Sequence, residues 1–396
     1  MKINGLLKKV TIFGLAALSA LYPLMPLRAE ETLEKKIQPT YLTETLEADE
    51  MISWSSTSFF SNGGCVLYRS TRKGEKAHMS LWTMNSDGGN KTPLSNGNYN
   101  NCDPDLSLDG EYTVFISDRN LIPEKMELHV YVRDMTIGIE KKLLDYGRTE
   151  IPKFTRDGKN IVFFFWPSLS ELIARESWIC MMDSDRVNPQ ESIEKLFKCY
   201  TSNDSFLFSS PYTNHMVYSA LPSQTLSCHT KLYILDTDTK KVKRLTKNPD
   251  NATENFPVFL PDGRVIFMMN FPTKKNPGGH ISYQSNLYII NIDGTNQKPL
   301  KEGDGIYAHP VVSPDGKYVA FISNENRKRS LKVMDMDRGK EGTLLETTTL
   351  EGSVGSCPLA FSPNVKNGTY ELFLSLHRNN NLDMAKIYFD ASIFNN

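Results

Sequence analysis

Titratable side chains recur about every fifty residues, just before the prolines of a repeated sequence pattern. Six of the seven copies carry one, namely Glu50, Asp103, Glu150, Asp204, Glu254 and His309, and Cys357 stands there in the seventh. Because converging like charges focus an electric field, the pattern predicts an acidic site for a divalent cation or for a basic or polar segment of a partner. An alternative stays open, in which these acids only accept hydrogen bonds from backbone amides before each strand.

The histidines lack the short spacings that are typical of a metal site. No His-x-His pair occurs among the seven, which are His78, His129, His215, His229, His280, His309 and His377. A repeating fold could still bring together ligands about fifty positions apart, so metal binding stays an alternative. A structural role is the simpler interpretation for His215 and His377, which lie in or beside predicted strands.

Two aspartate-rich segments, 236–239 and 335–339, faintly resemble calcium-binding loops. Neither has the complete set of oxygen ligands or the terminal glutamate of such a loop. Turns between strands are the better interpretation, because Asp side chains stabilise turns by accepting backbone hydrogen bonds. The recurrent Asp-Gly pairs are likewise predicted to form hairpin turns and not to act as catalytic acids.

The elements that position these residues are strands, and they occur in repeats. Each repeat contains a strand, a turn and a second strand, and Asp-Gly between apolar runs is a strong hairpin signal. Four copies match closely, at 103–117, 151–163, 256–267 and 309–323, and three weaker copies lie at 52–68, 208–218 and 358–376.

A second motif alternates with the first, an apolar or aromatic strand that ends in Asp or Asn. It occurs seven times, at 81–85, 130–134, 178–183, 232–236, 287–291, 331–335 and 387–390. A turn and a short strand follow most copies, which gives four strands in about fifty residues, as in a propeller blade. The sequence therefore predicts an all-β fold, a β-propeller of seven four-stranded blades, with six or eight left open. Short helices are expected only at 170–176 and 189–198.

The last unit lacks a fourth strand, because the chain ends soon after Asp390. Residues 37–43 precede the first repeat and can fill this vacancy. We therefore expect an N-terminal strand to close the ring and to cover an otherwise exposed sheet edge. Residues 30–396 are expected to form this single domain.

The N-terminus resembles a secretory signal. Lysines at positions 2, 8 and 9 precede an apolar run at 10–21, and the small residue Ala29 follows. This order predicts a signal peptide over residues 1–29, hence a periplasmic or secreted protein with no membrane-spanning segment after cleavage. An uncleaved anchor is the alternative, but the apolar run is shorter than the ~20 residues that a spanning helix needs.

Six cysteines are compatible with export but do not require disulfides. They are Cys65, Cys102, Cys180, Cys199, Cys228 and Cys357, and none forms the CxxC pair of a zinc site. Cys65, Cys180 and Cys357 lie in or beside apolar runs, which favours buried free thiols. Cys199 and Cys228 are the pair to test first for a bridge.

One repeat, 309–323, matches a known sequence pattern closely. It reads His-Pro-Val-Val-Ser-Pro-Asp-Gly and continues with Val-Ala-Phe-Ile-Ser. It resembles the repeat of TolB-type, WD40-like β-propellers, and the resemblance covers nearly all of the chain after the signal. TolB itself carries an α/β domain before its propeller, and we expect this chain to lack it, because few residues separate the expected cleavage site from the first repeat. The resemblance implies a binding scaffold for protein partners in the periplasm or cell envelope, and we expect a monomer.

Enzymatic alternatives come from other propellers with this repeat. Some precede serine peptidase domains, but no Gly-x-Ser-x-Gly nucleophile motif occurs here. Oligogalacturonate lyases are similar in length and use clustered histidines and a glutamine to hold a metal, so a metal-assisted polysaccharide lyase or hydrolase is the alternative. The balance of 45 Lys+Arg against 46 Asp+Glu argues against nucleic-acid binding. We therefore favour a non-enzymatic protein without a cofactor, apart from a divalent cation that the central channel of the predicted propeller could hold.

Overall fold

A computed structural model describes most of the chain after residue 38. The described residues are 39–42, 58–59, 64–71, 78–95, 99–119, 128–184, 193–201, 205–223, 229–275, 281–325, 328–346, 359–378 and 381–394. The predicted signal peptide and residues Glu50, Asp204, Cys228 and Cys357 lie outside these ranges.

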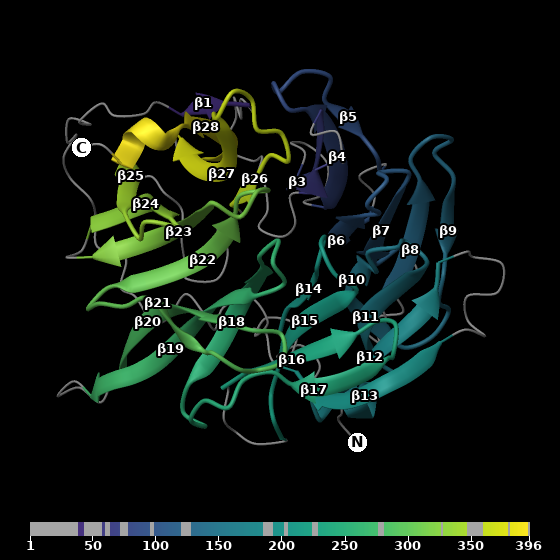
Figure 1. Ribbon diagram of the computed structural model, residues 1–396. Helices are drawn as coiled ribbons and strands as arrows, with labels where there is room; N and C mark the ends of the chain where they lie inside the picture. Colours follow the sequence, from purple (N-terminus) through teal and green to yellow (C-terminus); the bar gives the residue numbers. More distant parts are fainter. Residues whose placement is uncertain are drawn as a thin grey trace, which may run out of the picture.

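Antiparallel sheets are arranged around a common centre, so the predicted all-β propeller is confirmed (Figure 1). The first three sheets in chain order comprise β2 (Ser58–Phe59), β3 (Cys65–Thr71), β4 (Met79–Asn85) and β5 (Thr92–Pro93); β6 (Asn101–Leu106), β7 (Tyr112–Ser117), β8 (His129–Asp134) and β9 (Glu140–Lys142); and β10 (Arg148–Phe154), β11 (Asn160–Trp166), β12 (Glu176–Asp183) and β13 (Glu194–Tyr200).

The remaining strands continue the same order. They are β14 (Leu207–Ser209), β15 (His215–Ala220), β16 (Lys231–Asp236) and β17 (Lys241–Arg244); β18 (Thr253–Phe259), β19 (Val265–Lys275), β20 (Ile281–Ile290) and β21 (Lys298–Lys301); β22 (Ile306–Val312), β23 (Tyr318–Glu325), β24 (Lys328–Asp335) and β25 (Glu341–Glu346); and β26 (Ala360–Phe361), β27 (Tyr370–Arg378) and β28 (Asn381–Phe389). Of the strands that Figure 1 labels, β6, β10, β14, β18, β22 and β26 lie nearest the centre, and each is the first strand of its group.

The prediction of seven separate four-stranded blades was wrong. Among the described residues, five sheets have four strands each, and a sixth sheet has eight strands, from β18 to β25. A parallel pairing of Ser285 in β20 with Ile306 in β22 joins the two halves of this larger sheet. The sequence repeat shows how many strands follow one another along the chain, but it does not show which strands of neighbouring units are hydrogen-bonded.

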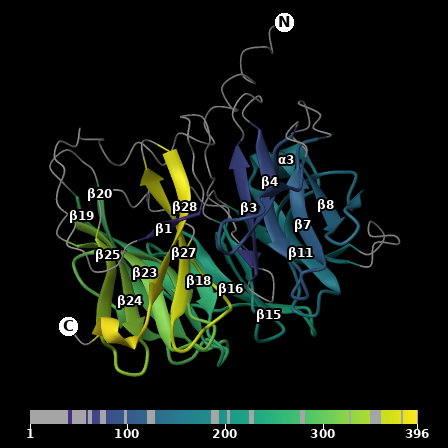
Figure 2. The same ribbon diagram turned by 90° about the horizontal axis from the view of Figure 1, so that it is seen from above.

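The predicted N-terminal pairing is confirmed. Strand β1 (Thr40–Tyr41) pairs with β28, with Thr40 opposite Lys386, and lies beside it in Figure 2. The Leu42 amide continues the ladder by donating to the Met384 carbonyl at 2.8 Å, and Lys386 Nζ donates to the Ser86 carbonyl at 2.8 Å. Side chains of the first and last sheets therefore meet around this short strand.

Helices are short and few among the described residues. Helix α3 (Leu169–Ile173) confirms the first expected helix, with Ser168 as its N-cap, and η3 (Ala391–Phe394) is a 3-10 turn. The second expected helix, 189–198, was wrong over residues 194–198, which belong to β13 and pair with β12, and residues 189–192 lie outside the described ranges. Within the described part of the chain, no helix combines the length and apolar character needed to cross a membrane.

The Asp-Gly turns have the predicted hairpin chemistry. Their glycines have positive φ, for example 76° at Gly110 and 73° at Gly316, where a side chain would be strained. The Asp315 carboxylate accepts hydrogen bonds from the Ser313 hydroxyl at 2.8 Å and from the Lys317 amide at 3.2 Å. Asp236 and Asp335 also accept two backbone amides each, which confirms the turn interpretation of those segments.

A network of four charges joins the two halves of the eight-stranded sheet. Glu325 accepts hydrogen bonds from Lys332 and from the Tyr307 hydroxyl, the latter at 2.6 Å. Lys301 reaches Glu341 at 2.8 Å from the neighbouring half. Partial burial alone would raise the pKa of Glu325, but the hydrogen bonds from Lys332 and Tyr307 outweigh it and lower that pKa to about 2.

We predict that Glu325→Gln destabilises the protein by about 1–2 kcal/mol at pH 7. Since folding lowers the pKa of Glu325, its contribution is complete above about pH 4.5 and disappears as the pH falls toward 2. The difference in urea midpoint between the two proteins should therefore shrink between pH 5 and about pH 2. Glu194→Gln, in an exposed pair with Lys240, is the control and should change the midpoint little at any pH. A constant difference for Glu325→Gln would contradict the role given to this network.

Candidate functional site

Equivalent positions on five innermost strands can be found from the turn that ends each strand. The residue that opens this turn donates its amide to a carbonyl at or just before the start of the second strand, and the five residues are Ser107, Thr155, Ser210, Leu260 and Ser313. Four positions before each of them lie Asp103, Ile151, Phe206, Phe256 and His309. We call these five residues the inner arc.

A β-bulge shapes the inner arc at four of its five positions. The φ angles are 48° at Asp103, 51° at Ile151, 50° at Phe256 and 54° at His309, and the ladder register shifts at each. A proline follows each of them, and a strand tolerates proline at an edge or a bulge, where no ladder donor is needed. Positive φ is strained for these residues, above all for the β-branched Ile151, at about 1–3 kcal/mol each.

Aromatic rings from three successive units touch one another in the inner arc. The ring centroids of Phe206 and Phe256 are 4.7 Å apart, and those of Phe256 and His309 are 4.2 Å apart. Phe206 and Phe256 are only partly buried, whereas His309 is 8% exposed. The arc therefore has an aromatic end with accessible ring surface.

Asp103 forms the other end of the inner arc, and the carboxylate of Glu150 lies near it. Asp103 in β6 is partly exposed, and Glu150 lies on the adjacent strand β10, next to Ile151. Arg148 binds Glu150 through Nε at 2.7 Å and Nη2 at 2.6 Å. Burial raises the pKa of Glu150, Arg148 opposes this rise, and the Asp103 carboxylate adds to it. The two predicted acids therefore act on each other.

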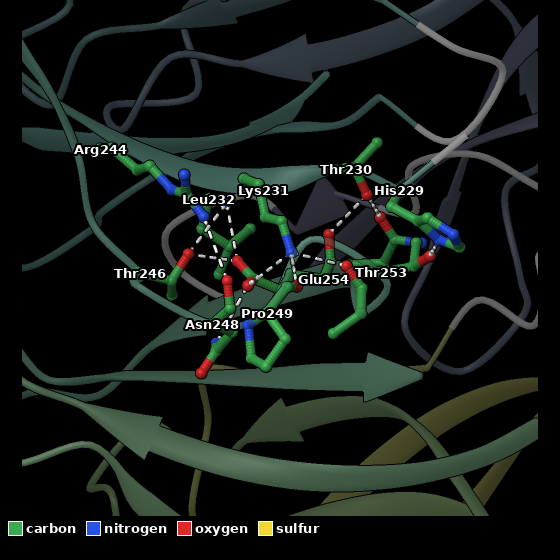
Figure 3. Close-up of polar contacts among 12 residues, drawn as sticks. His229, Thr230, Lys231, Leu232, Arg244, Thr246, Asn248, Pro249, Thr253 and Glu254 are labelled. Carbon is green, nitrogen blue, oxygen red and sulfur yellow. Dashed lines mark hydrogen bonds and ion pairs between the residues drawn. The ribbon is translucent and has the colours of Figure 1, made fainter. Parts of the chain in front are cut away.

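Glu254 has a different environment, although it also lies at the start of an innermost strand. It is completely buried, and the hydroxyl of Thr246 and the amide of Leu232 both donate to Oε2, the latter at 3.0 Å (Figure 3). Asn248 donates to Oε1 at 2.9 Å. Both carboxylate oxygens therefore have partners inside the protein.

Lys231 is the cation of this buried group and comes from β16. Its side chain is 0% exposed, its Nζ lies 3.7 Å from Glu254 Oε1, and it donates to the carbonyls of Pro249 and Ala252, the latter at 2.8 Å (Figure 3). Burial lowers the pKa of Lys231, and Glu254 opposes that shift. The group fixes the connection between β17 and β18.

The predicted ring of acids is thus divided among three environments. Asp103 and Glu150 lie together, Glu254 is enclosed with Lys231, and His309 packs against Phe256. Sequence reasoning missed Ile151, Phe206 and Phe256, because it looked for an acid near each proline. Counting back from the turn-opening residue would have found them.

The histidines and cysteines are dispersed. Among the described residues, no three His, Cys, Asp or Glu side chains come close enough to share a metal ion. Cys65, Cys102, Cys180 and Cys199 are free thiols, and Cys199 Sγ lies 3.2 Å from the Ser177 hydroxyl. Burial raises the pKa of both Cys180 and Cys199 to about 12.

Comparisons with known proteins show a fold that this chain shares with other proteins, but they do not assign the chain to a family. No family model matches the chain. Dipeptidyl-peptidase 5 of Porphyromonas endodontalis is 23% identical over 297 residues, which cover 73% of this chain and 40% of that protein. The Tol-Pal system protein TolB of Mannheimia succiniciproducens is 36% identical over 69 residues, which cover 17% of this chain and 15% of TolB. The chain therefore spans less than half the length of either relative.

A solved oligogalacturonate lyase in complex with manganese has a similar shape, with a TM-score of 0.67 at 12% identity. The match covers 91% of this chain and 95% of the lyase. At this identity the likeness shows the propeller fold alone. The alternative of a metal-assisted lyase needs a cluster of metal ligands, and the described residues contain no such cluster of His, Cys, Asp or Glu.

We predict that Lys231→Met costs about 3–5 kcal/mol of stability, because it leaves the buried Glu254 carboxylate without its cation. Lys231→Met combined with Glu254→Gln should cost less than the sum of the two single changes, since the double variant no longer buries an uncompensated charge. Lys240→Met, in an exposed pair, is the matched control. Thermal and urea unfolding of the wild-type protein, the two single variants and the double variant give the coupling, and strict additivity would contradict an energetic link between Lys231 and Glu254.

Proposed function

We propose that this chain is an exported, TolB-like β-propeller that acts as a protein-binding scaffold in the periplasm or cell envelope. The observation that carries the proposal is the inner arc, where partly accessible side chains of several innermost strands line one surface. The 69-residue similarity to TolB, a Tol-Pal system protein, supports the choice of a binding role. The signal pattern over residues 1–29 supports export.

The acidic part of the binding surface is assigned to Asp103 and Glu150. These two carboxylates lie near each other on adjacent strands and retain partial exposure. Glu254, with both oxygens bonded inside the protein, contributes through the fold and not through direct contact. Glu50 and Asp204 stay part of the proposed acidic site, and a divalent cation stays an alternative ligand for it.

The alternative is a propeller enzyme that acts on polysaccharide. The specific observation in its favour is the shape of the oligogalacturonate lyase, which matches this chain over nearly its whole length. A metal-assisted lyase would require a donor group that the described residues do not form.

We predict that Asp103→Asn combined with Glu150→Gln weakens partner capture about two- to fivefold, as expected for loss of partly exposed charges. The measurement is crosslinking in the intact native envelope, followed by identification and quantification of the partners. Asp145→Asn is the control, because this side chain is 56% exposed beside an outer strand. Thermal unfolding should confirm that all variants are folded, and an unchanged yield of every partner would count against the acidic surface.

We also predict that the purified protein contains no stoichiometric transition metal. Mass spectrometric metal analysis, before and after dialysis against a chelator, tests this directly. A metal bound in a one-to-one ratio and resistant to dialysis would favour the polysaccharide enzyme over the scaffold.

A further inference from the structure

The connection between β26 and β27 contains a tight turn with Asn367 and Gly368 at its tip. The flanking residues pair with each other, since the Thr369 amide donates to the Lys366 carbonyl at 2.8 Å and the Lys366 amide donates to the Thr369 carbonyl at 3.1 Å. The φ angles are 51° at Asn367 and 76° at Gly368. Positive φ at both central residues is typical of a type I′ turn, for which Asn-Gly is a preferred sequence. Backbone hydrogen bonds therefore hold this turn without the Asn367 side chain.

Two groups at the tip of this turn make no hydrogen bond. Asn367 and Gly368 are both exposed, and within the described part of the chain neither the Asn367 side chain nor the Gly368 amide has a hydrogen-bond partner. The turn asparagine Asn291 differs, because its side-chain amide donates to the Thr295 hydroxyl at 3.0 Å. The carboxamide of Asn367 can therefore rotate toward the nitrogen of the next residue.

Glycine leaves the nitrogen of residue 368 accessible. Apart from its two chain neighbours, no described residue has an atom within 4 Å of the position that a Cβ of Gly368 would occupy. Any other residue would place a side chain beside this nitrogen, and glycine also has the greatest backbone freedom. The approach of the Asn367 carboxamide carbon to this nitrogen therefore meets no side chain.

The two groups can react with each other in water alone. The Gly368 nitrogen gives its proton to hydroxide and attacks the carboxamide carbon of Asn367, so a new C–N bond closes a succinimide ring. The bond from this carbon to Nδ2 breaks, and Nδ2 takes a proton from water and leaves as ammonia. A further water molecule opens the ring at either carbonyl, which gives aspartate or isoaspartate. Asparagine is accordingly among the residues that are lost at high temperature.

We propose that Asn367 is a site of spontaneous deamidation, at which the folded chain converts a neutral amide into a carboxylate. The turn belongs to the last sheet, whereas no residue of the inner arc does. Deamidation of Asn367 is therefore independent of the proposed scaffold function and goes beyond it.

An isoaspartate product weakens the junction between the last two groups of strands. It adds the Cβ of residue 367 to the main chain, so the turn becomes longer and Lys366 no longer pairs with Thr369. The next residue, Tyr370, is buried, and its hydroxyl donates at 2.6 Å to Asp315 in the turn between β22 and β23. A lengthened turn moves the start of β27 and with it this hydrogen bond.

The chain contains two matched control asparagines. Asn90 and Asn296 are exposed and have φ angles of 51° and 53°, but Lys91 and Gln297 follow them in place of glycine. They test whether the glycine, and not exposure or a positive φ alone, makes Asn367 reactive. Other Asn-Gly pairs, at 4–5, 62–63 and 96–97, lie outside the described residues, and peptide mapping reports each of them separately.

The test incubates the purified full chain in warm buffer at neutral and at mildly alkaline pH. Peptide mass spectrometry then measures the deamidated fraction of each asparagine over time. We expect most of Asn367 to be converted before Asn90 or Asn296 changes detectably. Conversion should be faster at alkaline pH, because the deprotonated nitrogen is the nucleophile.

Asn367→Gln is the variant that isolates this site. It should abolish deamidation of residue 367, because glutamine would have to close a larger ring, and it leaves every other asparagine unchanged. After the same incubation, the wild-type protein should lose more of its thermal midpoint than Asn367→Gln does. An equal loss in both proteins would contradict the effect on the junction.

The free peptide Val-Lys-Asn-Gly-Thr-Tyr, which corresponds to residues 365–370, gives the reference rate. The proposal is overturned if Asn367 stays intact in the protein after this peptide is converted, or if Asn90 and Asn296 are converted as fast as Asn367. Either result leaves the scaffold function intact, because crosslinking in the envelope tests that function separately.

Discussion

The arrangement of the whole chain depends on the burial of both faces of its second strands. Strand β11 shows this most clearly, because residues 161–166 are all buried although successive side chains point to opposite faces. Ile161, Phe163 and Phe165 pack with the preceding sheet, and Val162, Phe164 and Trp166 pack with the following one. A sheet that is apolar on both faces needs a neighbour on each side. Repeating this requirement around the chain brings the sheets together about one centre, and it leaves accessible positions mainly on the innermost and outermost strands.

Much of this arrangement could be predicted because it follows from local chemistry. The turns around Gly110 and Gly316 require positive φ, and glycine after aspartate is the sequence signal for such a turn. The pairing of an N-terminal strand with the last sheet followed from the counting of strands, although the register of Thr40 opposite Lys386 did not. Predictions failed where pairing with a strand that is distant in the sequence determines the secondary structure. Residues 194–198 can form a helix by local preference, but hydrogen bonds to β12 make them a strand, and the pairing of Ser285 with Ile306 has no signature in either segment.

The candidate site was predictable only in part, for the same reason. Glu150 and Glu254 look alike in the sequence, since each lies shortly before the proline of a repeat. Their environments differ because Lys231, on the preceding unit, places a buried ammonium beside the buried carboxylate of Glu254. Glu150 has Arg148 from its own strand and stays near Asp103. A pattern of acids therefore predicted where to look, but the partners of each acid determine which of them can meet a ligand.

The inner arc can vary in chemistry because it contributes little to the ladders that hold the sheets together. Each arc position with a positive φ lies at a register shift, so its side chain is not part of the regular cross-strand pairing. Aspartate, isoleucine, phenylalanine and histidine occupy these four equivalent positions, whereas the turn four residues later keeps one hydrogen bond throughout. The bulge thus separates the residues that specify the fold from positions whose side chains can vary. Such a separation fits a chain that shares its fold with an oligogalacturonate lyase at only 12% sequence identity.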